Sequence, residues 1–196
     1  RAQVCAGRIM AVLRTRSTVV PADRPVRKLA ETGSMEMTDV EFSYPGAEEP
    51  VLHDINISLR PGTTTAVIGS TGSGKTTLAN LVPRLYDVTG GSIKLDGVDI
   101  RRLDMDLLWS RIGLVPQRPY LFSGTVASNL RYGSPEATDD QMWAALATAQ
   151  AADFVEQMDG GLEAPIAQGG SNVSGGQRQR LSIARALVKR PEIYVF

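Results

Sequence analysis

Hydrophobic and polar residues alternate along two stretches of the chain, residues 35–42 and 51–59, and this alternation predicts two β-strands. Pro45-Gly46 between them is a turn signal, so we expect the strands to pair in a mostly antiparallel sheet. A run of β-branched residues at 63–68 leads into a glycine and is typical of a buried strand in a parallel sheet. Two more short strands and a turn are predicted at Ser92–Leu95, Gly113–Val115 and Asp96-Gly97.

The spacing of apolar residues becomes helical between about residues 121 and 189, most clearly over 141–154 and 181–188. Pro191 ends the last of these helices, and residues 193–196 begin another strand. The chain therefore runs in the order sheet, strand–loop–helix, helical block and strand. This order predicts an α/β fold with an inserted helical region.

The first 33 residues follow a different pattern. Apolar residues recur loosely at helical spacing over 4–13, Pro21 and Pro25 stop any helix, and the mixed composition of 17–33 predicts a linker. The whole chain has 21 basic and 21 acidic residues, but its first 30 residues hold seven basic residues against Asp23 alone. Such a leader indicates a transit peptide, a nucleic-acid-binding arm or the cytoplasmic flank of a membrane span. Because the chain opens with arginine rather than methionine, we expect it to continue upstream, which disfavours the transit peptide.

Composition narrows the class of protein. The chain has 196 residues, 42% of them hydrophobic, which is enough for a substantial core. A single cysteine excludes a disulfide scaffold, and ordinary numbers of glycine and proline, 19 and 11, exclude collagen-like and low-complexity sequences. Charged residues, glycine and proline interrupt every apolar stretch before it reaches about 18 residues, so no membrane-spanning helix is predicted within this chain.

The first chemical motif is a phosphate-binding loop at residues 69–76, which fits the pattern G-x-x-x-x-G-K-[ST] between a predicted strand and a helix-forming run. Gly69, Gly72 and Gly74 allow the backbone N–H groups to turn inward toward phosphate oxygens. Lys75 reaches the β- and γ-phosphates, and the Thr76 hydroxyl is a ligand for Mg²⁺. A loop of this kind indicates nucleotide binding but names no reaction.

The second motif begins at Ser174, which can cap the helix that follows it. Gly175 and Gly176 allow another backbone to approach closely, and Gln177 completes the segment. The exposed N–H groups of the first helical turn form a second anion site. One chain with two anion sites at helix N-termini is unusual.

Together the two motifs resemble the nucleotide-binding domain of ABC transporters, of the exporter type whose membrane domain precedes it in the same chain. Phe42-Ser-Tyr44-Pro-Gly46 is similar to the exporter segment whose aromatic ring stacks on adenine. Val115-Pro-Gln117 is similar to the Q-loop, which couples the nucleotide to the membrane domain. Residues 121–130 resemble the entry into the helical subdomain, and residues 1–13 the cytoplasmic end of the last transmembrane helix. The basic leader agrees with the positive-inside tendency, which favours the membrane flank.

The resemblance implies a P-loop NTPase fold of the ABC type. Its parts would be a mixed or parallel RecA-like core, an antiparallel β subdomain and a helical subdomain at about 121–185. Residues 1–33 would be the end of a transmembrane helix and a linker, and residues 34–196 an incomplete nucleotide-binding domain.

The resemblance also assigns site residues. Thr76 and Gln117 would bind Mg²⁺, and residues 174–177 would contact the ATP of a partner domain. The residues that would bind ATP in this chain are Tyr44, Gly69, Ser70, Thr71, Gly72, Ser73, Gly74, Lys75, Thr76, Thr77 and Gln117.

The partners implied are a second nucleotide-binding domain, paired head to tail as a homo- or heterodimer, and the transmembrane domain of the same parent chain. ATP and Mg²⁺ are the expected ligands, and nucleic acid is not expected. The parent protein would act at the cytoplasmic face of the cell membrane as an ATP-driven exporter. The alternative is a soluble ABC-type ATPase that acts on nucleic acid or ribosomes, although such proteins usually lack the patterns at 42–46 and 121–125.

In this family a Mg²⁺-binding Asp, a catalytic Glu and a switch histidine follow the last strand, so we expect them beyond Phe196. His53 precedes the phosphate loop and cannot be the switch. We therefore assign no catalytic residue here, and expect the 196-residue polypeptide to bind MgATP weakly and not to hydrolyse it. Strands beyond Phe196 would cover Val67, Ile68 and Ile193, so we also expect these side chains to be exposed and the polypeptide to aggregate.

Overall fold

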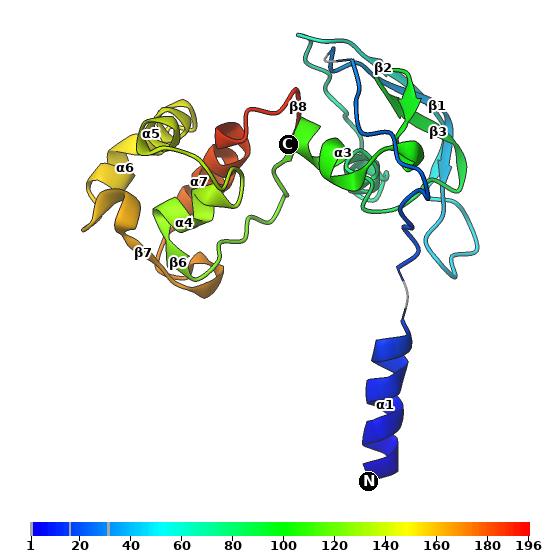
Figure 1. Ribbon diagram of the computed structural model, residues 1–196, viewed down its shortest axis with the longest axis horizontal. Helices are drawn as coiled ribbons and strands as arrows, with labels where there is room; N and C mark the ends of the chain where they lie inside the picture. Colours follow the sequence, from blue (N-terminus) through cyan, green and yellow to red (C-terminus); the bar gives the residue numbers. More distant parts are fainter. Residues whose placement is uncertain (1, 16, 31) are drawn as a thin grey trace.

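A four-stranded antiparallel sheet organises the first half of the chain (Figure 1). The computed structural model describes residues 2–15, 17–30 and 32–196. Strand β1 (Met35–Phe42) lies between β2 (Leu52–Leu59) and β3 (Gly90–Leu95), and β4 (Val98–Asp99) extends the sheet beyond β3. The predicted antiparallel strands are confirmed. Met35 and Met37 of β1 are buried, and an irregularity at Asp39, with φ 48°, shifts the alternation so that Val40 and Phe42 are buried as well.

Two short helices and a parallel strand pair complete this half. Helix α2 (Lys75–Leu81) ends just before Pro83, which cannot continue the helix. A 3₁₀ turn, η1 (Ile100–Arg102), leads to α3 (Met105–Arg111), and the indole N–H of Trp109 donates to the Pro83 carbonyl oxygen at 3.0 Å. Strand β5 (Ile112–Leu114) pairs in parallel with β8 (Ile193–Val195). We call residues 35–114 with 193–195 the sheet half.

The strand predicted at 63–68 is not present, and this prediction was wrong. Residues 61–73 are all exposed, with Val67 50% and Ile68 90% accessible to solvent. A β-branched run forms a strand only where a neighbouring strand supplies ladder hydrogen bonds, and among the described residues β8 pairs with β5 rather than with this segment. The expected exposure of Val67 and Ile68 is confirmed, whereas Ile193 is half-buried.

The helical half, residues 121–188, packs around its own core (Figure 1). Its main helices are α4 (Val126–Arg131), α5 (Asp139–Thr148), α6 (Ala152–Glu156) and α7 (Gly175–Val188). The strands β6 (Gly124–Thr125) and β7 (Pro165–Ile166) pair antiparallel, and short 3₁₀ turns lie at η2 (Gly161–Glu163) and η3 (Gln168–Gly170).

The single helix predicted over 141–154 is two helices. Gln150 adopts a left-handed conformation with φ 55°, and the Ala151 N–H donates to the Leu146 carbonyl oxygen at 2.7 Å. This bond back across the last turn is the Schellman arrangement that ends a helix. Apolar periodicity continues through the break, so spacing alone could not reveal it.

The N-terminal helix α1 (Ala2–Arg14) projects away from the rest of the molecule (Figure 1). Within residues 2–15, 17–30 and 32–196, no helix is both long and apolar enough to cross a bilayer. The segment predicted as a linker is docked on the sheet half: the Val26 N–H donates to Arg102 O at 2.8 Å, and the Val26 carbonyl accepts from the Asp104 N–H at 3.0 Å.

Candidate functional site

The phosphate loop is closed around the ammonium group of Lys75. Its Nζ donates to the carbonyl oxygens of Gly69, at 2.8 Å, and Ser70, at 2.7 Å, and lies 3.3 Å from the Ser73 hydroxyl. The loop therefore holds a cation at its centre without help from a distant part of the chain. Because all three partners are neutral oxygens, an anion that entered the loop would meet an ammonium whose charge is not compensated by a carboxylate.

Two glycines fix the shape of the loop. Gly74 caps α2 with φ 86°, and a Cβ there would lie 2.6 Å from Leu52 Cδ2 and 3.3 Å from the Val51 carbonyl oxygen. A Cβ at Gly69 would lie 2.6 Å from the Ser73 hydroxyl. Only glycine lets the loop turn this closely against β2 and against itself.

The two threonines after Lys75 face different surroundings. Thr76 is exposed at the second position of α2, where its hydroxyl is free to meet a metal ion. Thr77 is buried, and its hydroxyl lies 3.0 Å from the Tyr44 hydroxyl. The side chain of Thr77 therefore contacts Tyr44.

Tyr44 lies in an aromatic cluster beside the loop. Its ring meets Phe42 edge-on at 4.8 Å between centroids and Tyr86 edge-on at 5.5 Å. The bond to Thr77 connects this ring to the helix that carries Lys75. The structure thus brings the predicted adenine-binding ring and the predicted phosphate-binding loop onto adjoining elements.

Gln117 follows β5 and is exposed. Val115 is buried just before it, and its N–H donates to the Val195 carbonyl oxygen at 2.8 Å, which continues the parallel pairing. Gln117 therefore lies beyond the carboxyl end of a parallel strand, where α/β proteins bind ligands. A hydroxyl from Thr76 and an amide oxygen from Gln117 are hard oxygen donors, and such donors suit Mg²⁺.

The predicted second anion site, residues 174–177, lies in the helical half at the start of α7. Ser174 and Gln177 form a reciprocal capping box: the Gln177 N–H donates to Ser174 Oγ at 3.2 Å, and the Ser174 N–H donates to Gln177 Oε1 at 2.8 Å. Ser174, Gly175 and Gly176 are exposed, and a Cβ at Gly176 would have open space around it. The predicted cap is confirmed, and the two anion sites belong to different halves of the chain.

Sequence reasoning missed a buried amide that holds the entry to the helical half. Asn129 is 1% exposed, its Oδ1 accepts from the Phe122 N–H at 2.9 Å, and its Nδ2 donates to the carbonyl oxygens of Phe122 and Thr125 at 2.9 and 3.0 Å. Asn129 thus satisfies the backbone of a loop that has no ladder partner at those groups. A polar residue at an apolar position of α4 is the signal that could have identified it.

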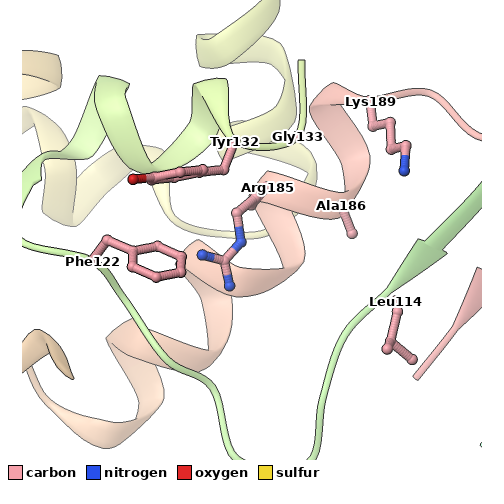
Figure 2. A pocket seen from close by; sticks show the side chains of 7 residues that line it. All are labelled: Leu114, Phe122, Tyr132, Gly133, Arg185, Ala186 and Lys189. Carbon is pink, nitrogen blue, oxygen red and sulfur yellow. The ribbon is translucent and has the colours of Figure 1, made fainter. Parts of the chain in front are cut away.

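A pocket between the helical half and β5 contains two basic side chains that sequence reasoning also missed. Figure 2 shows the Arg185 guanidinium directed toward the rings of Phe122 and Tyr132. Arg185 Nη2 donates to the Tyr120 carbonyl oxygen at 3.0 Å, and burial lowers the pKa of Arg185. Burial also lowers the pKa of Lys189, whose Nζ donates to the Ile112 carbonyl oxygen at 3.0 Å. Lys189, directly after α7, thus binds a backbone carbonyl of the sheet half, whereas Arg185 binds one in the segment that leads into the helical half.

Comparison with known proteins identifies the family. The sequence profile of the family described as ABC transporter matches residues 52–196. An uncharacterized ABC transporter ATP-binding protein of Mycobacterium tuberculosis is 56% identical over 200 residues, which cover 100% of this chain and 34% of that protein. A multidrug efflux ATP-binding/permease protein of the same species is 42% identical over 195 residues, which cover 100% of this chain and 16% of that protein.

Two further proteins extend the comparison. An ATP-dependent lipid A-core flippase of Thiobacillus denitrificans is 48% identical over 164 residues, which cover 83% of this chain and 28% of the flippase. The structure of a bacterial Atm1-family ABC exporter with ATP bound matches with a TM-score of 0.90 at 31% identity, over 98% of this chain and 33% of that one.

This chain spans about a third of the length of its mycobacterial relative and a smaller part of the efflux protein and the flippase. The match to the exporter structure confirms the predicted fold of the ABC type. Because the matched residues contain both the phosphate loop and the segment 174–177, the chain belongs to the ABC transporter family, with an ATP-binding domain homologous to those of the exporters.

Proposed function

We propose that this chain is the ATP-binding part of the motor of an ABC exporter, and that ATP binding and hydrolysis in the parent protein drive export. The observation that carries the proposal is the phosphate loop, in which Lys75 is held by the carbonyl oxygens of Gly69 and Ser70 at the start of α2. A lysine in a cradle of backbone groups at a helix N-terminus suits a nucleotide polyphosphate.

Each site residue has a role in this proposal. Lys75 binds the β- and γ-phosphates, and the N–H groups of residues 69–77 bind the remaining phosphate oxygens. Tyr44 stacks on adenine, and Thr76 and Gln117 hold Mg²⁺. When bound, Mg²⁺ neutralises phosphate charge.

The segment 174–177 would act on the ATP of a partner. Ser174, Gly175 and Gly176 are exposed at the start of α7, in the other half of the chain from the phosphate loop, and the capping box uses only the N–H groups of Ser174 and Gln177. Such separation suits a head-to-tail pair, in which each chain contributes one anion site to each nucleotide. ATP would favour the closed pair to the extent that it binds that state more tightly.

The transmembrane domain of the parent chain would be the second partner, with residues 1–33 as the connection to it and 34–196 as the nucleotide-binding domain. The projecting α1 and the basic composition of the first 30 residues support this role and a place at the cytoplasmic face of the membrane. The names of two relatives, a multidrug efflux protein and a lipid A-core flippase, support export rather than the soluble alternative that handles nucleic acid.

Calorimetric titration of the 196-residue chain with MgATP tests the proposal. We expect Lys75→Ala to weaken binding at least about tenfold, because charge-assisted bonds to phosphate contribute about 1.5–3 kcal/mol each. Lys28→Ala is the matched control. It removes an exposed lysine of the docked N-terminal segment, which is the predicted linker held to the sheet half through Val26, and should bind MgATP as the wild type does. Equal affinity of wild type and Lys75→Ala would contradict a phosphate-binding role for the loop.

We also propose that this polypeptide alone binds MgATP without appreciable turnover. Hydrolysis needs a positioned water and a base, and residues 69–77 of the phosphate loop contain no carboxylate or imidazole that could act as one. Phosphate release by the purified chain should therefore stay at background. Release well above background that Lys75→Ala abolishes would refute this part of the proposal.

A further inference from the structure

A buried arginine lies at the far end of the phosphate-loop helix. Arg84 follows α2 and Pro83, is 3% exposed and adopts a left-handed conformation with φ 57°. Its N–H donates to the Leu81 carbonyl oxygen at 3.0 Å, which closes the turn at the end of the helix. A non-glycine residue is held in this strained conformation only where its surroundings fix it.

The contacts of the Arg84 guanidinium hold the residue in this conformation. Nε and Nη2 bind the two carboxylate oxygens of Asp87 at 2.6 and 3.1 Å, a bidentate pair in which the arginine side chain is 2% exposed. Nη1 lies 3.4 Å from both the Arg101 carbonyl oxygen and the Met105 sulfur. Nη2 also donates to the Val20 carbonyl oxygen at 2.9 Å.

The contact with Val20 connects two distant parts of the chain. Val20 lies in the docked N-terminal segment, which leads from α1 toward β1, whereas Arg84 lies in the turn that follows α2. Further along, this segment is fixed to the sheet half by the Val26 bonds and by Arg111, whose Nη2 donates to the Ala30 carbonyl oxygen at 2.9 Å. Val20 is thus the point where the segment meets the helix that begins at the phosphate loop.

Helix α2 is a short, stiff connection between the two sites. It has seven residues and is about 10 Å long. Its end is held by the bond from Leu85 N–H to the Asn80 carbonyl oxygen at 3.0 Å and by the contact of Trp109 with Pro83. The turn that carries Arg84 is thus fixed to the end of the helix, so a displacement of Lys75 and the first turn would move Arg84 as well.

We propose that Arg84 is a positioning residue that links the state of the phosphate loop to the N-terminal segment and to α1. This inference rests on the proposed function, since it takes MgATP as the ligand of the loop. The guanidinium suits this task because its planar fork holds Asp87 and Val20 at the same time, which a lysine ammonium cannot do in the same geometry.

Hydrogen exchange of the full 196-residue chain, with and without MgATP, tests the link. In the wild type we expect MgATP to change the exchange rates of amides in residues 17–24 by at least about fivefold, the lower end of typical coupling between two sites. In Arg84→Lys we expect this response to be lost while the MgATP affinity stays within about threefold of wild type. Arg27→Ala is the matched control, because it removes an exposed ion pair of the same segment with Asp104 and leaves Arg84 intact.

Cys5 allows a second measurement, because a fluorophore can be attached without introducing a cysteine. It is the single cysteine of the chain and is exposed on α1, so a fluorophore attached there reports the mobility of that helix. We expect MgATP to change the anisotropy of this label in the wild type and in Arg27→Ala but not in Arg84→Lys. If Arg84→Lys does not fold, Asp87→Asn, which loosens the same guanidinium, takes its place.

The outcomes separate the two proposals. Absence of MgATP binding to the wild type would overturn the proposed function. Binding that leaves both the exchange of residues 17–24 and the Cys5 label unchanged would overturn the link. A full response in Arg84→Lys or its substitute would also overturn it, because the arginine would then have only a structural role.

Discussion

At the scale of single residues, Gly74 has the most constrained backbone in the phosphate loop. In Gly74→Ala the methyl group would meet Leu52 and the Val51 carbonyl oxygen at a positive φ. A left-handed non-glycine residue costs about 1–2 kcal/mol, so we expect the free energy of unfolding to fall by about 2 kcal/mol and MgATP binding to weaken. Urea denaturation measures the first effect and calorimetric titration the second.

Gly176→Ala is the control for this substitution. A Cβ at Gly176 meets open space, and alanine is the better helix former. We expect the stability of Gly176→Ala to be unchanged or slightly raised. If the two variants lost stability equally, the contacts around Gly74 would not be the cause.

The ionisation of Asp96 should make the free energy of unfolding depend on pH. Burial raises the pKa of Asp96, but hydrogen bonds from Thr32 and Ser34 outweigh burial and leave the pKa below the ordinary value of 3.8. A lowered folded-state pKa means that this group stabilises the fold above about pH 3.8 and that the contribution is lost as the pH falls through the folded value. We expect the unfolding free energy of wild type to drop more steeply below pH 4 than that of Asp96→Asn. Parallel pH profiles would contradict this assignment.

Some of these residues could be predicted from the sequence, and others could not. The phosphate loop and the segment 174–177 were identified because each builds its site from consecutive residues, whose backbone does most of the binding. Arg84 was missed because its partner Val20 lies 64 residues away. Asn129 was missed because burial of a polar side chain is visible only once its loop is placed.

At the scale of elements, the capping box of α7 has a measurable effect. Ser174→Ala removes the hydroxyl that accepts from the Gln177 N–H, and loss of such a cap costs about 1 kcal/mol. We expect the unfolding free energy of the helical half to fall by that amount, as measured by urea denaturation. Ser171→Ala, at an exposed serine that precedes the helix, should leave it unchanged.

The accuracy of the element predictions follows from what stabilises each one. The pattern over 35–42 predicted β1 to the residue, because its apolar side chains are buried in the core and its polar ones are exposed, although the irregularity at Asp39 was not predicted. The run 63–68 was wrongly predicted as a strand because strand formation depends on a neighbour. The break at Gln150 was missed because a Schellman ending needs only two backbone bonds and leaves the apolar periodicity intact.

At the scale of the whole molecule, the α/β fold and the inserted helical region were predicted correctly from the order of the elements. The docking of the N-terminal segment was not predicted, because its composition is typical of a linker. The groups that anchor it are backbone groups and buried charges, which no local pattern reveals. The pocket at Arg185 likewise depends on how two halves meet, which no local pattern describes.

The exposed run at 63–68 has a consequence for the whole molecule in solution. Val67 and Ile68 present apolar side chains to water, which favours self-association. We expect Ile68→Thr to lower the fluorescence of a hydrophobic dye and to reduce light scattering at high protein concentration. Thr64→Ser, an exposed change in the same segment, should alter neither. Unchanged scattering in Ile68→Thr would mean that aggregation starts elsewhere.

The two separate cores imply that this molecule has two cooperative units. The buried residues of the helical core all fall within 121–188 and those of the sheet core within 35–112, while Ile193 and Val195 of β8 pack against the sheet core. The two tryptophans divide between them, with Trp109 in the sheet half and Trp143 in the helical half.

Each tryptophan can therefore report the melting of its own half when the other is replaced by phenylalanine. We expect two distinct thermal transitions. Gly74→Ala should lower the midpoint temperature of the transition reported by Trp109, and Ser174→Ala should lower that of the transition reported by Trp143. Coincident transitions would show a single unit. Because each core is built from residues close together in sequence, each half could begin to fold before the other is complete.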